Sequence, residues 1–259
     1  MQLTSTLAAP AREGRGAHAS AHTNGVPRLP DALAQIRALV AKDLLAEWRG
    51  RDVVASTGVF ALLVLVIFAF AFDLRAESAL LVTPGALWVA FAFATTLALG
   101  RTMALEAERG TLEGLLLCPA SAGTIFFAKL LTNLVFTTAL EVVLLPVFAI
   151  FFNAPVLHPA LFLVVALGTL GLVGTGTLLA AIAAGTRARE ILLPVLLFPI
   201  SVPVLIAAVK ATAAVLDAAG SPASGSGLAG VLPWLQLLAG YDVLFAAAGY
   251  LAFEYVVEQ

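Results

Sequence analysis

A short charged stretch between two apolar segments carries the residues best suited to binding another protein. It runs from Leu105 to Ala120 and reads LEAERGTLEGLLLCPA. Its leucines can share one helical face at spacings of three, four and seven residues, and Pro119 marks the end of the helix. We expect this helix to dock on a soluble partner; a solvated loop helix is the alternative. The expected contact residues are Glu106, Glu108, Arg109, Leu112, Glu113, Leu115 and Leu116.

Two carboxylates, Glu141 and Asp242, lie inside apolar runs. An ionisable side chain within a membrane is costly unless it is paired, protonated or directed into a polar cavity. Glu141 lies near the middle of its run and precedes Pro146. Its functional role would be in a substrate path or in gating, and its structural role would be a hydrogen bond to a neighbouring helix. Asp242 interrupts the last apolar run and is a second candidate of the same kind.

Motifs for catalysis, metal binding or nucleotide binding are missing from the sequence. There is no Walker A motif and no HExxH motif, and the single cysteine, Cys118, excludes an internal disulfide and a cysteine-based metal cluster. His18 and His22 lie in a polar tail. His158 lies in a loop, where a solvated histidine is the ordinary interpretation and haem or metal ligation the alternative. We expect no catalytic residue, no metal and no directly bound cofactor, so any ATP must bind another chain.

The composition is that of a polytopic membrane protein. Apolar residues make up 61% of the 259-residue chain and charged residues 12%, and the mean hydropathy is +1.02. Soluble domains have about 25% charged residues. Apolar runs of about 18 residues or more predict membrane-spanning α-helices, and no alternating pattern typical of a β-barrel is visible.

The N-terminal part divides into a tail and an amphipathic helix. Residues 1–30 are polar, without apolar periodicity, and we expect a disordered cytoplasmic tail. Residues 31–51 predict a helix with a basic polar face, which suits an elbow helix at the membrane surface; a soluble packing helix is the alternative. The apolar residues that recur at helical spacing are Leu33, Ile36, Val40, Leu44 and Trp48.

Residues 31–259 as a whole are expected to form one all-α transmembrane domain with six spans. Pro84 and Gly85 begin the second span. Three prolines in the fifth span predict a bent helix that ends at about residue 210. A loop with a short re-entrant or surface helix would follow at 211–230. The six spans are expected at about 53–72, 84–103, 124–152, 161–184, 191–210 and 232–253.

The basic residues predict the orientation of the chain. Twelve of the 14 lysines and arginines fall before the first span or in the loops after the second and fourth spans, together with their flanks. Arg75 and Lys210 are the exceptions. The positive-inside rule therefore predicts that both termini are cytoplasmic, and that the stretch at 105–120 is cytoplasmic too.

The order of elements resembles the ABC-2 type of ABC-transporter permease, and within it the CcmB family of the cytochrome c maturation system. The segment 105–131, LEAERGTLEGLLLCPASAGTIFFAKLL, resembles that family's cytoplasmic coupling helix and is the most specific part of the likeness. Segments 84–101, 167–182 and 192–208 resemble its second, fourth and fifth spans. The likeness extends from about residue 31 to the C-terminus.

This resemblance implies a permease in the bacterial inner membrane that works with other chains. The implied partners are an ATP-binding subunit (CcmA-like), a second copy of this chain, a CcmC-like haem-handling membrane protein and a CcmE-like chaperone. Haem is a possible substrate; alternatively, ATP hydrolysis releases the haem-loaded chaperone. Membrane lipid surrounds the spans, and no nucleic-acid partner is expected.

Three other functional classes remain as alternatives. The chain could be an ABC-2 permease that exports a lipid, a polysaccharide or a drug. It could be a scaffold that assembles a haem-handling complex without transport. An intramembrane enzyme has the least support, because no acid–base or metal constellation lies within the spans.

Overall fold

The computed structural model describes residues 29–50, 52–72, 76–108, 121–153, 158–184, 186, 188–220 and 227–257, and nearly all of these residues are helical. These residues form seven α-helices and no strand. The helices are α1 (Leu29–Gly50), α2 (Asp52–Ala71), α3 (Ala76–Glu108), α5 (Ala122–Phe152), α6 (Pro159–Ala184), α7 (Arg189–Gly220) and α8 (Gly227–Val257).

The long helices are apolar enough to cross a membrane. Within the described ranges, five stretches meet this condition: Leu81–Thr102, Ala122–Phe152, Pro159–Ala183, Ile191–Ala219 and Ala229–Phe253. In α2, the apolar part is shorter and covers Ala55–Ala71. The chain is therefore an all-helical, multi-pass membrane protein.

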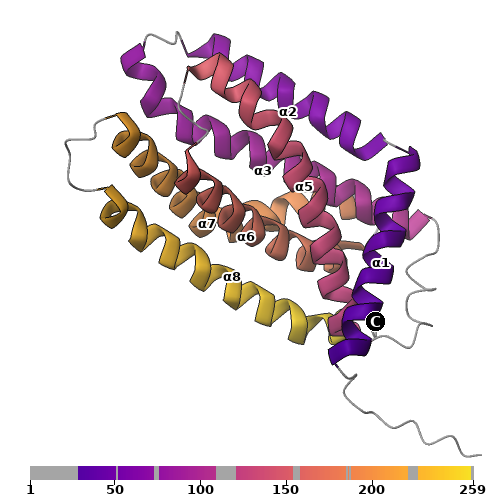
Figure 1. Ribbon diagram of the computed structural model, residues 1–259. Helices are drawn as coiled ribbons and strands as arrows, with labels where there is room; N and C mark the ends of the chain where they lie inside the picture. Colours follow the sequence, from indigo (N-terminus) through magenta and orange to yellow (C-terminus); the bar gives the residue numbers. More distant parts are fainter. Residues whose placement is uncertain are drawn as a thin grey trace, which may run out of the picture.

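Helices α2 to α8 lie side by side and alternate in direction, and α1 lies across one end of the bundle (Figure 1). We call this the α1 end. The starts of α2, α5 and α7 and the ends of α3, α6 and α8 lie there. The described chain therefore begins and ends at the same end of the bundle.

Helix α6 lies at the centre and packs against α3, α5, α7 and α8. Its glycines let side chains of neighbouring helices approach its backbone, as small residues do in membrane bundles. Trp88 of α3 packs against Gly168, and Leu99 of α3 packs against Gly176. Small residues of α6 therefore form part of its contact with α3.

Two further glycine contacts join α5 to α8 at the α1 end. A Cβ at Gly123 of α5 would lie 3.2 Å from Cζ of Tyr250, and a Cβ at Gly249 of α8 would lie 2.6 Å from Cε1 of Phe126. Each helix therefore contributes one glycine and one aromatic ring to a reciprocal contact.

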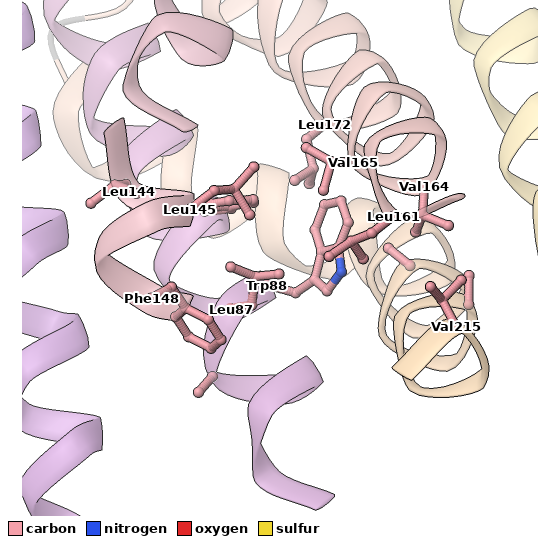
Figure 2. Close-up of a cluster of buried hydrophobic side chains, with 14 of the residues drawn as sticks. Leu87, Trp88, Leu144, Leu145, Phe148, Leu161, Val164, Val165, Leu172 and Val215 are labelled. Atoms are coloured by element: carbon pink, nitrogen blue, oxygen red, sulfur yellow. The ribbon is translucent and has the colours of Figure 1, made fainter. Parts of the chain in front are cut away.

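A large apolar core fills the half of the bundle away from the α1 end. Figure 2 shows its centre, where Trp88 of α3 lies among aliphatic side chains of α6. The indole nitrogen of Trp88 donates a hydrogen bond of 2.9 Å to Thr212 Oγ1 of α7. The fully buried residues of this core include Leu87, Trp88, Phe91, Phe148, Leu161, Val164 and Val204.

The predicted helix bounds are accurate for some spans and wrong for others. The predictions 53–72, 124–152 and 161–184 agree closely with α2, α5 and α6. Helix α3 extends beyond the predicted span 84–103 at both ends and contains Pro84, whereas its apolar stretch, Leu81–Thr102, agrees closely with that span.

Helix α7 also departs from the prediction, because it continues through Pro194, Pro199 and Pro203 to Gly220. The predicted end at residue 210 is wrong. Each proline removes one backbone N–H, but the helix is held by a buried, alanine-rich face. That face includes Ala207, Ala208 and Ala211.

Candidate functional site

The predicted docking stretch lies only partly within the described residues. Glu106 and Glu108 belong to the last turns of α3, so the first part of the stretch continues the second span instead of starting a separate helix. Arg109, Leu112, Glu113, Leu115 and Leu116 lie outside the described residues. The end of α3 and the start of α5, which this stretch connects, both lie at the α1 end of the bundle (Figure 1).

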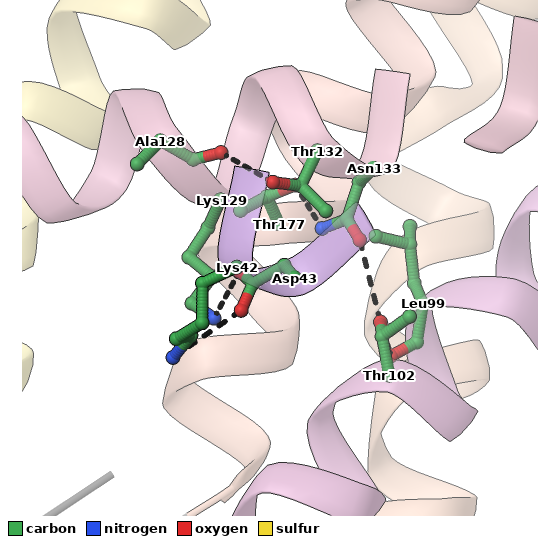
Figure 3. A network of polar contacts seen from close by, with 9 residues as sticks. All are labelled: Lys42, Asp43, Leu99, Thr102, Ala128, Lys129, Thr132, Asn133 and Thr177. Atoms are coloured by element: carbon green, nitrogen blue, oxygen red, sulfur yellow. Dashed lines mark hydrogen bonds and ion pairs between the residues drawn. The ribbon is translucent and has the colours of Figure 1, made fainter. Parts of the chain in front are cut away.

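A buried ion pair ties α1 to α5. Lys129 Nζ lies 2.8 Å from Asp43 Oδ2, and the two side chains are 6% and 13% exposed (Figure 3). Lys42 lies 3.3 Å from the other carboxylate oxygen but is 52% exposed. Either charge would be costly to leave unpaired where little water is present, so the Asp43–Lys129 pair favours the position of α1 against α5.

A second set of contacts links α3, α5 and α6 one turn away. Asn133 of α5 donates a hydrogen bond of 3.1 Å to Thr177 Oγ1 of α6 and accepts one of 3.3 Å from Thr102 of α3 (Figure 3). Thr102 lies six residues before the end of α3. We call Asp43, Lys129, Asn133, Thr102 and Thr177 the polar seam.

The sequence contained one usable signal for this seam. Lys129 lies eight residues into an apolar helix, where an unpaired ammonium group is costly and a partner is therefore required. Helical periodicity places Asp43 on the polar face of α1, but it does not show which face meets another helix. In the structure Asp43 faces α5, whereas Leu33, predicted on the apolar face, is 60% exposed.

Glu141 lies in the interior of the bundle, and its carboxylate accepts a hydrogen bond from Thr169 of α6. The side chain is 3% exposed. A carboxylate hydrogen bonded between two helices is the structural role considered for this residue. Asp242 lies against Gly171 of α6, two residues after Thr169, so Glu141 and Asp242 approach α6 at nearly the same level along its axis.

Asp242 lies in α8 against α6 and is 8% exposed. Neither of its carboxylate oxygens has a hydrogen-bond partner among the described residues. The adjacent Tyr241 is well bonded, since its hydroxyl accepts from Thr175 of α6 and donates to the carbonyl of Ile200 in α7, both at 3.0 Å. Asp242 is therefore the less satisfied of the two intramembrane carboxylates.

No group of three or more histidine, cysteine, aspartate or glutamate side chains that could hold a metal ion occurs within the described parts of the chain. His158 accepts a hydrogen bond from the backbone N–H of Ala160 at the start of α6. Most of the polar contacts described above join one helix to another.

Comparison with known proteins gives a consistent result. Residues 34–257 match the family model described as CcmB protein. The chain is 30% identical over 201 residues to Heme exporter protein B of Pseudomonas aeruginosa. The aligned residues cover 77% of this chain and 87% of that protein. It is 34% identical over 175 residues to Heme exporter protein B of Rhodobacter capsulatus, and here the aligned residues cover 66% of this chain and 79% of that protein. The protein of the same name from Paracoccus denitrificans is 29% identical over 172 residues, with the same coverage.

Proposed function

The chain belongs to the CcmB family, and on this basis we propose that it is the membrane-spanning permease subunit of a haem export system acting in cytochrome c maturation. The family match over residues 34–257 is the observation that carries the proposal. The five long apolar spans support it, because a permease needs several helices that cross the membrane. With α2 as a further crossing, the domain 31–259 would have six spans.

We further propose that ATP is hydrolysed by a partner chain, a CcmA-like subunit, and not by this one. The absence of a Walker A motif from the sequence supports this. The docking surface would be the stretch from Glu106 to Leu116, with Leu112, Leu115 and Leu116 as apolar anchors and Glu108, Arg109 and Glu113 in polar contacts.

The basic residues support a cytoplasmic position for this surface. Arg37, Lys42, Arg101 and Lys129 all lie on the parts of α1, α3 and α5 at the α1 end, whereas Lys210 lies in the second half of α7. By the positive-inside rule the α1 end would face the cytoplasm, and the long helices would cross the bacterial inner membrane. Both termini would then be cytoplasmic, and α1 would be the elbow helix.

The polar seam suggests how a movement at the docking surface would enter the membrane. Closure of the ATPase pair would push the stretch between α3 and α5. Thr102 and Asn133 would transmit the displacement to α6, and the Asp43–Lys129 pair would carry α1 with α5. The proposed mechanism is therefore a concerted tilt of α3 and α5 against α6.

The work done by ATP is either haem export or release of a haem-loaded, CcmE-like chaperone. The apolar spans contain no histidine, the residue that most often ligates haem iron, and this favours chaperone release. The complex would contain a second copy of the chain and a CcmC-like membrane protein.

Affinity purification in mild detergent, with a tag on the C-terminus and mass spectrometry of the recovered proteins, tests this proposal. We expect a small ATPase and a haem-handling membrane protein. Recovery of an ATPase with unrelated export proteins would contradict the role in haem export. Full cytochrome c maturation with a hydrolysis-deficient ATPase would identify a scaffold instead of a transporter.

A further inference from the structure

The Asp242 carboxyl group lies against the backbone of α6. A Cβ at Gly171 would lie 2.8 Å from Asp242 Oδ1, 2.9 Å from Val204 Cγ2 of α7 and 3.2 Å from Cδ1 of Tyr241. Only a glycine leaves room for the carboxyl group at this point. The carboxyl group is therefore enclosed by α6, α7 and α8, near the middle of the apolar span Ala229–Phe253.

No positive charge among the described side chains faces this carboxyl group. Helix α6 contains no charged residue. On α7, Lys210 and Asp217 are exposed; on α5, Lys129 is paired with Asp43 and Glu141 is bonded to Thr169. On α8, Tyr241 is the titratable neighbour, and its hydroxyl group donates a hydrogen bond to the carbonyl of Ile200.

A carboxylate without a hydrogen-bond donor or a cation inside a membrane loses its hydration and gains nothing in return. A neutral carboxylic acid loses much less, because it carries no net charge. We propose that Asp242 is a proton-binding site inside the bundle: its carboxyl group holds a proton while α8 lies against Gly171, and the proton passes to water when α6 and α8 separate. This proposal depends on the chain spanning a membrane and not on its role in haem export.

Infrared difference spectroscopy of the full chain in lipid nanodiscs tests the proposal. The spectrum of the wild-type protein minus that of Asp242→Asn should show, at neutral pH, the carbonyl band of a carboxylic acid. The same difference taken with Glu141→Gln serves as a reference for a carboxyl group that has a hydrogen-bond donor. Bands of an ionised carboxylate in the Asp242 difference spectrum would overturn the proposal.

A second measurement needs no variant and so does not depend on how Asp242→Asn folds. Dicyclohexylcarbodiimide is an apolar reagent that adds to protonated carboxyl groups within membranes, and peptide mass spectrometry locates the adduct. We expect an adduct on Asp242 and none on the exposed Asp217, which a water-soluble carbodiimide should modify instead. Absence of an adduct on Asp242 would contradict the proposal.

Discussion

The six-membered ring of Trp88 on α3 occupies the space that a side chain at Gly168 on α6 would need. A Cβ at Gly168 would lie 2.7 Å from Cζ3 and 2.9 Å from Cζ2 of the ring. The indole cannot easily turn aside, because its nitrogen is bonded to Thr212 on α7. One aromatic side chain therefore sets the distances among three helices.

This contact predicts that Gly168→Ala destabilises the bundle. Overpacking of a well-filled interior costs about 1–3 kcal/mol, and the added methyl group must displace a ring that is held by its own hydrogen bond. Thermal unfolding in detergent measures the effect. Gly174→Ala is the matched control, since the nearest atom to its Cβ would be Leu130 Cδ1 at 3.9 Å. Equal unfolding temperatures for the two variants would contradict the predicted role of Trp88.

The ion pair between α1 and α5 predicts that the loss of either partner destabilises the protein. Removal of one member of a buried pair costs about 3–5 kcal/mol, because the remaining charge loses its main partner where little water is present. Lys129→Met leaves Asp43 with the exposed Lys42 at 3.3 Å, so we expect its cost at the lower end of this range. Lys42→Met, at a side chain that is 52% exposed, is the control and should have little effect.

The double variant Asp43→Leu/Lys129→Met completes this test. An apolar pair can replace a buried ion pair at little cost, so the double variant should be more stable than the Asp43→Leu single variant. Additive losses of stability in chemical or thermal unfolding would show that the two residues act independently.

The hydrogen bond between Thr169 and Glu141 predicts different effects for two substitutions of Thr169 and a small effect for Glu141→Gln. Thr169→Val removes the donor and should destabilise the bundle by about 1–3 kcal/mol, because it leaves a buried carboxyl group unsatisfied. Thr169→Ser keeps the hydroxyl group and should cost less. Glu141→Gln keeps an acceptor oxygen and should preserve both stability and cytochrome c maturation. A Glu141→Gln variant that folds normally but fails in maturation would show that the residue acts in the transport cycle.

Arg109→Glu combined with Glu113→Arg tests the proposed docking surface. We expect the double charge reversal to lower cytochrome c yield and recovery of the ATPase in pull-down, because the polar contacts with the partner would be reversed. Membrane insertion should be unchanged. The control is Asp217→Arg, a charge reversal at an exposed site in the last turn of α7. Cells with this variant should give a normal yield of cytochrome c. Normal maturation by the double variant would contradict the docking proposal.

Apolar length predicts the spans well where a single run is bounded by polar residues. The runs that became α5 and α6 are of this kind, and their predicted limits differ from the observed limits by two residues or fewer. The limits of α7 could not be predicted in this way. Local propensity ends a helix at repeated prolines, but packing of Val204 and Ala208 inside the core outweighs the loss of three backbone donors.

The contacts of the polar residues were harder to predict than the helices that carry them. Periodicity identifies a polar face on α1 but does not show that Asp43 meets a lysine 86 residues away. Glu141 and Asp242 were both identified as costly charges in the membrane. In the structure Glu141 is hydrogen bonded to Thr169, whereas Asp242 has no hydrogen-bond partner among the described residues. This difference depends on which side of α6 each carboxyl group meets.

The reciprocal contacts of Gly123 with Tyr250 and of Gly249 with Phe126 also restrict how the protein can move. The rings of Tyr250 and Phe126 fill the space that a side chain at Gly123 or Gly249 would need, so a shift of α8 along α5 would have to break both contacts. These contacts therefore oppose sliding between the two helices and favour their movement together at the α1 end. A displacement that begins at the first turn of α5 is thus carried to the C-terminal end of α8, so a fluorescent or spin label there would report on a movement that begins more than a hundred residues earlier in the chain.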